Sequence, residues 1–332
     1  MGQQNSWRAF SALAQVDRDT AQTANVLVDF AGDPAKPEIE RSTNAERNTG
    51  TAFPTRHREL KRMMSFSHEE PATPSVVALC ASQVLGYDAA SAIGGTGVTR
   101  HRTTPNVARK LIPLRTMVEN DGLAQWLFKG VACTGFKLSG ERGGNVELSA
   151  DFLASGLKET NAASKPALSA ESWLTYCDVN AVKGGTFNGT TVSGGTSYSA
   201  TLASFSVDVR ANGQGRHHFG DMTKAFGSII AGRFSAAIEM DLEIEDQAHR
   251  DDLESGAEFS LHIPMVGGIA AGGEPYAVHV IAPRCVYGTL PQSFQDGQLQ
   301  EKAGFIVLDD GTYDGLVIDI HNLNATSYLA TS

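Results

Sequence analysis

The sequence is poor in charged residues and contains no long apolar run. Charged residues make up 19% of the 332 residues, and 27 Lys and Arg stand against 37 Asp and Glu, which gives a formal net charge of −10. A protein that reads nucleic-acid sequence needs a basic footprint, so this shortage of cations argues against that class. No apolar run approaches the roughly 18–20 residues of a membrane span, and the N-terminus lacks the segments of a signal peptide. We therefore expect no membrane contact and synthesis in a cytoplasm.

Cysteine and catalytic motifs are also scarce. The four cysteines are widely separated, at Cys80, Cys133, Cys177 and Cys285. Because no CxxC or CxH spacing occurs and their contexts are apolar, we expect buried, reduced thiols and no structural zinc site. The nine histidines are scattered, and the adjacent pair His217 and His218 would face opposite ways on a strand. No nucleophile elbow, phosphate loop, metalloprotease motif or dinucleotide fingerprint occurs, so we expect no catalytic residue, metal, cofactor or enzymatic activity.

Glycine and alternating segments are what the sequence has in quantity. It contains 34 Gly and 12 Pro beside 41% hydrophobic residues, a composition that favours strands and turns over long helices. From Ile238 onward, apolar and acidic residues alternate for eight positions, which is the period-2 pattern of a half-buried strand. The polar side of this predicted strand would carry Glu239, Asp241, Glu243 and Glu245.

A β-hairpin is predicted next to a glycine-rich turn. Residues 136–139 and 146–152 alternate apolar and polar side chains, and the segment between them includes GERGG. A glycine-rich turn between two alternating segments is typical of a hairpin. The return strand would point Glu147 and Asp151 away from the core.

Two short helices are predicted. The first is expected over residues 74–85 with Thr73 as its cap, and the second over residues 247–255 with Asp246 as its cap. A glycine follows each segment and would end the helix. The first segment has an apolar face at helical spacing, whereas the second has few apolar residues and is expected on the surface.

The order of these elements predicts a mainly β chain with an internal duplication. Residues 1–180 and 181–332 each show two strands, a helix and three strands, although no letter-for-letter repeat is visible. We expect the two halves to pack as one continuous unit. Three stretches, 32–56, 88–106 and 184–197, are polar and rich in Gly, Pro or Ser, and are predicted as loops.

At this point the sequence resembles a known family. Residues 129–144, KGVACTGFKLSGERGG, and their continuation to Gly156 resemble siphophage tail tube proteins, the major tail proteins of phages with long non-contractile tails. The second half is similar in the order and spacing of its motifs, at residues 204–213, 229–246, 255–263 and 278–288.

The resemblance implies a structural protein of the virion tail, made in the host bacterial cytoplasm. Tail tube proteins fold as antiparallel sheets that form a sandwich or small barrel with a short flanking helix. Their subunits join into rings, and the rings stack into a hollow tube that conducts DNA. The implied partners are copies of the chain and the tail terminator, distal tail and tape measure proteins, while genomic DNA passes without specific binding. If each half is one fold unit, three chains give a pseudo-sixfold ring, which we favour over six chains. A tube protein of a contractile tail, a bacteriocin or a secretion apparatus is a second interpretation.

A DNA conduit must not grip DNA, so carboxylates are suited to its wall. The candidate lumen-lining residues are Glu147, Asp151, Glu239, Asp241, Glu243 and Glu245. The same residues could instead lie on the outer tube surface, because alternation does not say which face is which. A third interpretation is a β-rich carbohydrate-binding or hydrolytic protein, since residues i and i+2 of a strand are about 6.5–7 Å apart. A catalytic pair needs two carboxyl groups in different environments. Four acidic residues in equivalent positions on one strand favour a solvent-exposed face instead.

Overall fold

The chain folds into a mainly β protein with one large antiparallel sheet, 56% strand and two short helices. The computed structural model describes residues 6–29, 34–43, 57–198, 200–244, 247–295 and 298–331. The predicted mainly β class with short helices is confirmed, but no strands of the described residues close into a barrel. No helix in this part of the chain is both long and apolar enough to cross a membrane.

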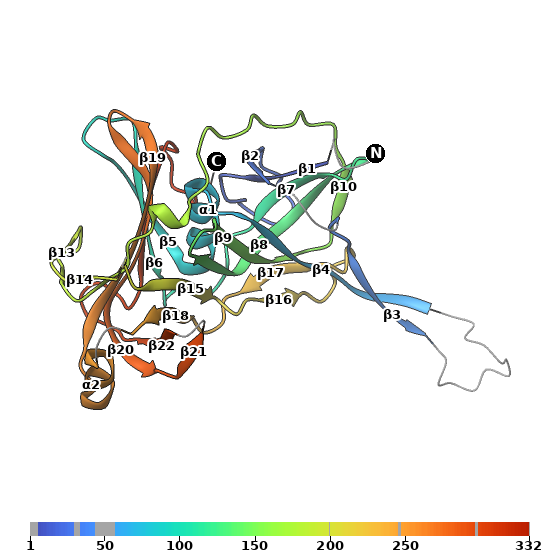
Figure 1. Cartoon of the computed structure of the whole chain (residues 1–332). Coiled ribbons are helices and arrows are strands. Elements are labelled where there is room, and N and C mark those ends of the chain that lie inside the picture. Colours follow the sequence, from blue (N-terminus) through green and yellow to red (C-terminus); the bar gives the residue numbers. More distant parts are fainter. Residues whose placement is uncertain are drawn as a thin grey trace.

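The first half contributes a central helix and several of the strands that surround it (Figure 1). Its elements within the described residues are β1 (Trp7–Ser11), β2 (Ala24–Val28), β3 (Glu38–Thr43), β4 (His57–Pro71), α1 (Pro74–Leu85), β5 (Gly86–Ala92), β6 (Thr99–Pro105), β7 (Arg115–Asn120), β8 (Gln125–Glu141), β9 (Val146–Ala154) and β10 (Lys158–Thr160). The long β8 and β9 form the predicted hairpin.

The second half begins with short strands and continues into long ones. A 3-10 turn (Tyr176–Asp178) at the end of the first half precedes them. The elements of the second half within the described residues are β11 (Val182–Lys183), β12 (Thr186–Phe187), β13 (Val192–Ser193), β14 (Thr196–Ser197), β15 (Leu202–Arg210), β16 (Gln214–His217), β17 (Phe226–Ile230), β18 (Ser235–Glu243), α2 (Ala248–Ser255), β19 (Phe259–Ala271), β20 (Glu274–Thr289), β21 (Gln292–Gln295), β22 (Gln298–Val307) and β23 (Val317–Asn322). The predicted acidic strand corresponds to β18.

Six antiparallel strands from both halves form a continuous part of the sheet, in the order β4-β9-β8-β15-β18-β22. Every second side chain of these strands enters the core. Residues on this side that are at most 1% exposed include Leu138, Leu148, Val207, Met240 and Ala303. Because successive side chains of a strand point to opposite faces, the alternate residues form one outward surface.

Helix α1 lies at the centre of the molecule, enclosed by strands (Figure 1). Eleven of its twelve residues are buried, which is more than the single apolar face predicted from the sequence. Gln83 fits this interior because its amide donates to the carbonyl of Pro113 at 2.7 Å and accepts from the amide of Cys133 at 3.1 Å. Thr73 is the N-cap residue as predicted, but its side chain makes no capping hydrogen bond.

Helix α2 lies on the surface, as its low apolar content predicts. It has no buried residue, and Gly256 ends it in the left-handed conformation with φ 66°. The N-cap is Gln247, whereas the predicted cap, Asp246, lies outside the described residues.

The three predicted loops contain strands, which corrects the prediction. The stretch 88–106 forms most of the β5–β6 hairpin, and short strands β12, β13 and β14 fall within 184–197. Strand β3 falls within 32–56, of which residues 32–33 and 44–56 lie outside the described part of the chain. Strand β6 escaped prediction because its buried side chains are polar, as with His101, which contacts Asp88 at 3.1 Å.

The cysteines are divided between the core and the surface. Cys80, Cys133 and Cys285 are buried free thiols, as expected, whereas Cys177 is exposed and contradicts the prediction. Burial raises the pKa of Cys285 to about 12, so its thiolate is not populated at neutral pH.

Candidate functional site

One outward surface of the central sheet gathers the predicted carboxylates. We call this surface the acidic face: it is the solvent side of β9, β8, β15, β18 and β22. Five of the six predicted residues lie on it, namely Glu147, Asp151, Glu239, Asp241 and Glu243, each exposed or half-buried. The sixth, Glu245, lies outside the described residues. The side chains between them along each strand enter the core, so period-2 alternation identifies this face correctly.

Strand register places these carboxylates in rows across the sheet. Glu239 pairs with Ser206, Ser206 with Ser139, and Ser139 with Glu147. With neighbouring strands about 4.8 Å apart, the backbones of the two glutamates are separated by roughly 14 Å. Along β18 itself, Glu239, Asp241 and Glu243 follow one another at every second position, about 6.5–7 Å apart. Serine hydroxyls, not a second acid, are the nearest neighbours across the sheet.

Three basic side chains lie between the carboxylates and pair with them, whereas Lys137 on β8 forms no ion pair with the described residues. The N–O distances are 3.0 Å for Lys302–Glu239, 2.7 Å for Arg142–Glu243 and 3.0 Å for Arg210–Asp151. The hydrogen bond to Glu239 raises the pKa of Lys302. Such exposed pairs stabilise a fold by only about 0–1 kcal/mol. Their consequence is that these cations are already engaged by carboxylates. The sequence did not reveal the pairs, because each joins strands far apart in the chain.

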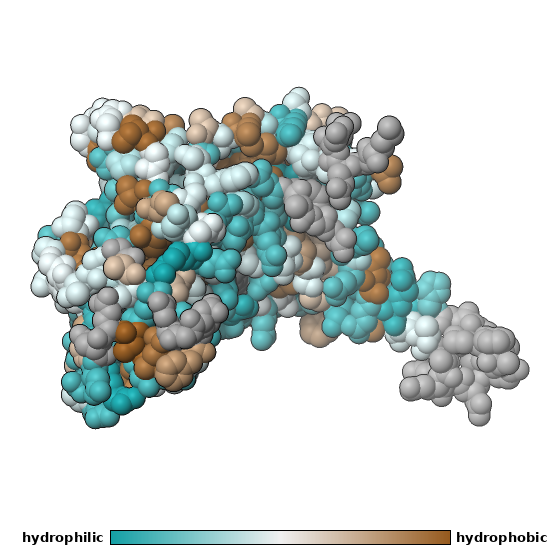
Figure 2. All heavy atoms as spheres, in the orientation of Figure 1, coloured by the Kyte–Doolittle hydropathy of each residue, from teal (hydrophilic) through white to brown (hydrophobic). Residues whose placement is uncertain are grey.

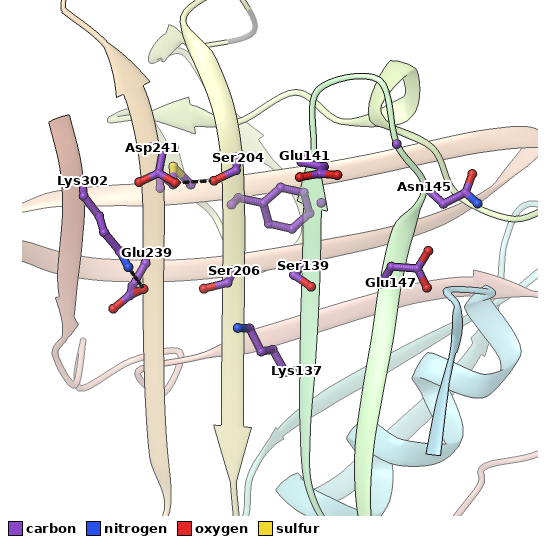
Figure 3. Close-up of a pocket in the computed structure, with 14 residues that line it drawn as sticks. Lys137, Ser139, Glu141, Asn145, Glu147, Ser204, Ser206, Glu239, Asp241 and Lys302 are labelled. Carbon is purple, nitrogen blue, oxygen red and sulfur yellow. Dashed lines mark hydrogen bonds and ion pairs between the residues drawn. The ribbon is translucent and has the colours of Figure 1, made fainter. Parts of the chain in front are cut away.

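A hollow of about 430 Å³ opens on the acidic face (Figure 3). In Figure 3, Lys302 reaches toward Glu239 from the neighbouring strand, and Ser204 lies beside Asp241. The Ser204 hydroxyl donates to an oxygen of Asp241 at 2.5 Å. The described residues that line the hollow include neither histidine nor cysteine. The lining is therefore open sheet surface that offers hydroxyl, carboxylate and ammonium groups.

A second cavity, of about 370 Å³, contains three histidines that appear scattered in the sequence. They come from β19, β20 and β23: Nε2 of His262 is 3.1 Å from Nδ1 of His279, and the ring centroids of His279 and His321 are 5.4 Å apart. Burial lowers the pKa of His262 and of His279 to about 4, so both imidazoles are neutral at pH 7. Within the described chain, no three His, Cys, Asp or Glu side chains are arranged to hold a metal ion.

The acidic face is the larger and more continuous of the two features. Its groups repel polyanions at close range, and the field of such a surface extends about 8–10 Å at physiological salt. Neither a protein-family model nor a curated protein sequence matches the chain. The geometry of this face is therefore the basis on which its function is inferred.

Proposed function

We propose that the chain is a structural subunit of a hollow phage tail tube, in which copies form rings, the rings stack, and genomic DNA passes through the lumen. The observation that carries this proposal is the acidic face, a carboxylate-bearing surface that continues across strands of both halves of the chain and is backed by a core. A surface of this kind suits a wall, because it is a sheet face whose hollow of about 430 Å³ opens to solvent.

The electrostatics of the acidic face suit a DNA conduit. Glu147, Asp151, Glu239, Asp241 and Glu243 would line the lumen and repel phosphates. Lys302, Arg142 and Arg210 lie within 3.0 Å of carboxylate oxygens, so phosphates would have to compete with those carboxylates. With these cations paired to carboxylates, the wall would let DNA slide without holding it. The same cations reduce the net negative charge of the wall and so limit repulsion between neighbouring carboxylates.

The tail-tube-type fold, with two units in one chain, belongs to the same proposal. The sheet is open within the described residues of one chain, and an open sheet has edges that a ring would cover. Two units per chain give a ring of three chains with pseudo-sixfold symmetry. In the tail, such rings would contact the tail terminator, distal tail and tape measure proteins.

Negative-stain electron microscopy of the purified, concentrated protein tests the proposal. We expect hollow rods with a regular axial repeat, and end-on views with threefold or pseudo-sixfold symmetry. A protein that stays monomeric at every concentration and salt condition, and that hydrolyses a polysaccharide, would contradict it and support the hydrolytic interpretation. End-on views with true sixfold symmetry, from six chains per ring, would support the tube proposal but contradict two fold units per chain.

A further inference from the structure

The two halves of the chain pair their strands in the same pattern. In each half, the strand ahead of the helix pairs with a strand from beyond the helix: β4 with β9 in the first half, and β18 with β22 in the second. Each of these later strands forms a hairpin with a long strand, β9 with β8 and β22 with β20 and its continuation β21. The strand next to the pre-helix strand is β3 in the first half and β15 in the second.

The long strands β8 and β20 also have matching neighbours. The first part of β8 pairs with β7 and with β10, and the first part of β20 pairs with β19 and with β23. Helix α1 packs on β8, and helix α2 packs on β20. The correspondence therefore covers the helix and the strands β3, β4, β7, β8, β9 and β10, whereas the β5–β6 hairpin that follows α1 has no counterpart after α2, where β19 comes next.

The corresponding long strands of the two halves differ in what pairs with one of their edges. Beyond β7, the edge of β8 continues into β15, with seven residue pairs from Ser204 with Glu141 to Arg210 with Gly135. Beyond the pair of Phe259 with Cys285, where β19 ends its pairing, the same edge of β20 and β21 has no paired strand within the described residues. The strand that corresponds to β15 is β3, which pairs only with β4 in this part of the chain.

We infer that the free edge of β20–β21 binds strand β3 of a second copy of this chain, repeating between molecules the β8–β15 junction that joins the two halves within one molecule. The β3–β4 hairpin projects away from the body of the molecule (Figure 1), so β3 is accessible to a neighbour. Each copy carries one edge of each kind. Such a heterologous contact repeats from copy to copy, and it closes into a ring when the rotation between neighbours completes the circle, as the proposed tube requires.

The chemistry of the β21 edge suits a covered surface. Exposed edge strands are usually protected by charged side chains, but β21 reads Gln-Ser-Phe-Gln and carries no charge. Phe294 is 79% exposed, and Ile306 on the adjacent β22 is 52% exposed. Figure 2 shows apolar atoms at the surface where Figure 1 places β20 and β21. A strand from a second copy would cover both the open backbone groups and these side chains.

Disulfide trapping tests the inferred junction, which rests on the proposed ring. In a Cys177→Ser background, Ser293→Cys on β21 is combined in turn with Ile39→Cys, Glu40→Cys, Arg41→Cys or Ser42→Cys on β3. Facing positions on paired strands have Cβ atoms about 4.5–5.5 Å apart, and the closer, non-hydrogen-bonded pairs reach the roughly 3.5–4.5 Å of a disulfide after a small shift. The matched control combines Ser293→Cys with Ser91→Cys on β5, which is also an exposed edge position. We expect oxidation of assembled protein to convert the monomer band into multimers for at least one β3 position, and to leave the control monomeric.

The outcomes separate the junction from the proposed function. Hollow rods that assemble while none of the four pairs cross-links, or while the control cross-links equally, would overturn the β20–β21 to β3 junction and leave the tube proposal intact. Protein that forms no rings would instead contradict the tube proposal itself. As a second measurement, Phe294→Pro removes a backbone donor that faces the free edge, because the hydrogen bond from Lys302 to Pro291 and the strand register turn the amide of Phe294 away from β22. We expect it to abolish assembly while the circular dichroism spectrum stays unchanged, and rods formed normally by this variant would also overturn the junction.

Discussion

The histidine side chains of the second cavity are expected to make the stability of the fold depend on pH. His279 lies between His262 and His321, and both neighbours disfavour its protonation. The charged groups that face it are Asp319, which favours protonation, and Arg100, which opposes it. Burial is the largest cause of the lowered pKa, so the neutral imidazole belongs to the folded state.

Acid is expected to destabilise the fold through these two histidines. Their pKa is 6.5 in the unfolded chain and about 4 in the folded chain. The unfolded state therefore binds more protons between these values, and stability falls as the pH falls from 6.5 toward 4. At about 1.4 kcal/mol per pH unit, each histidine costs on the order of 2 kcal/mol at pH 5.

Urea unfolding at pH 7, 6 and 5 measures this effect. The variant His262→Gln with His279→Gln keeps polar, neutral side chains, and we expect its free energy of unfolding to change less between pH 7 and pH 5 than that of the unmodified protein. The control, His217→Gln with His218→Gln, alters exposed histidines and should preserve the original pH dependence. Equal pH dependence in all three proteins would contradict the assignment.

At the scale of elements, the ends of the two helices offer a matched comparison. Gly86 and Gly256 both adopt positive φ, at 82° and 66°. A Cβ at Gly86 would clash with the guanidinium of Arg109, which donates to the carbonyl of Val84 at 2.7 Å at the end of α1. A Cβ at Gly256 would meet no atom within 4 Å.

Alanine at the two positions should therefore have different costs. Gly256→Ala should lower the free energy of unfolding by about 1 kcal/mol, the cost of a left-handed residue with a side chain. Gly86→Ala should lower it by about 3 kcal/mol, because the displaced Arg109 also loses charged hydrogen bonds to the helix end. Urea denaturation of both variants checks the difference. Equal losses would mean that Arg109 moves away without cost.

The sequence predicted those elements in which periodicity and packing agree. Helix α1 and strand β18 have their apolar residues at the spacing that burial requires, and both were predicted within a few residues. Strand β6 was missed because Thr99, His101 and Thr103 are buried although they are polar, which hydropathy cannot express. The carboxylates of the acidic face follow from alternation within one strand, whereas partners such as Lys302 follow only from the pairing of distant strands.

On the scale of the whole molecule, the carboxylates of the acidic face contribute little to the free energy of folding, because they are exposed or half-buried. They contribute to the net charge of −10, which opposes compactness through self-repulsion. A surface of this kind is expected to tolerate charge changes without unfolding, so its role can be tested in the intact assembly.

Charge reversal on the acidic face should convert a repelling wall into one that retains DNA. For Asp241→Lys with Glu243→Lys, we expect assembly to proceed and the free energy of unfolding to change by less than about 1 kcal/mol. Assembled tubes of this variant should retain a short DNA duplex in a form protected from nuclease, and retention should fall steeply with salt. The control, Asp251→Lys with Glu254→Lys on the exposed side of α2, changes the net charge equally. DNA bound by the control should remain open to nuclease, whereas unprotected DNA in both variants would place the acidic face outside the lumen.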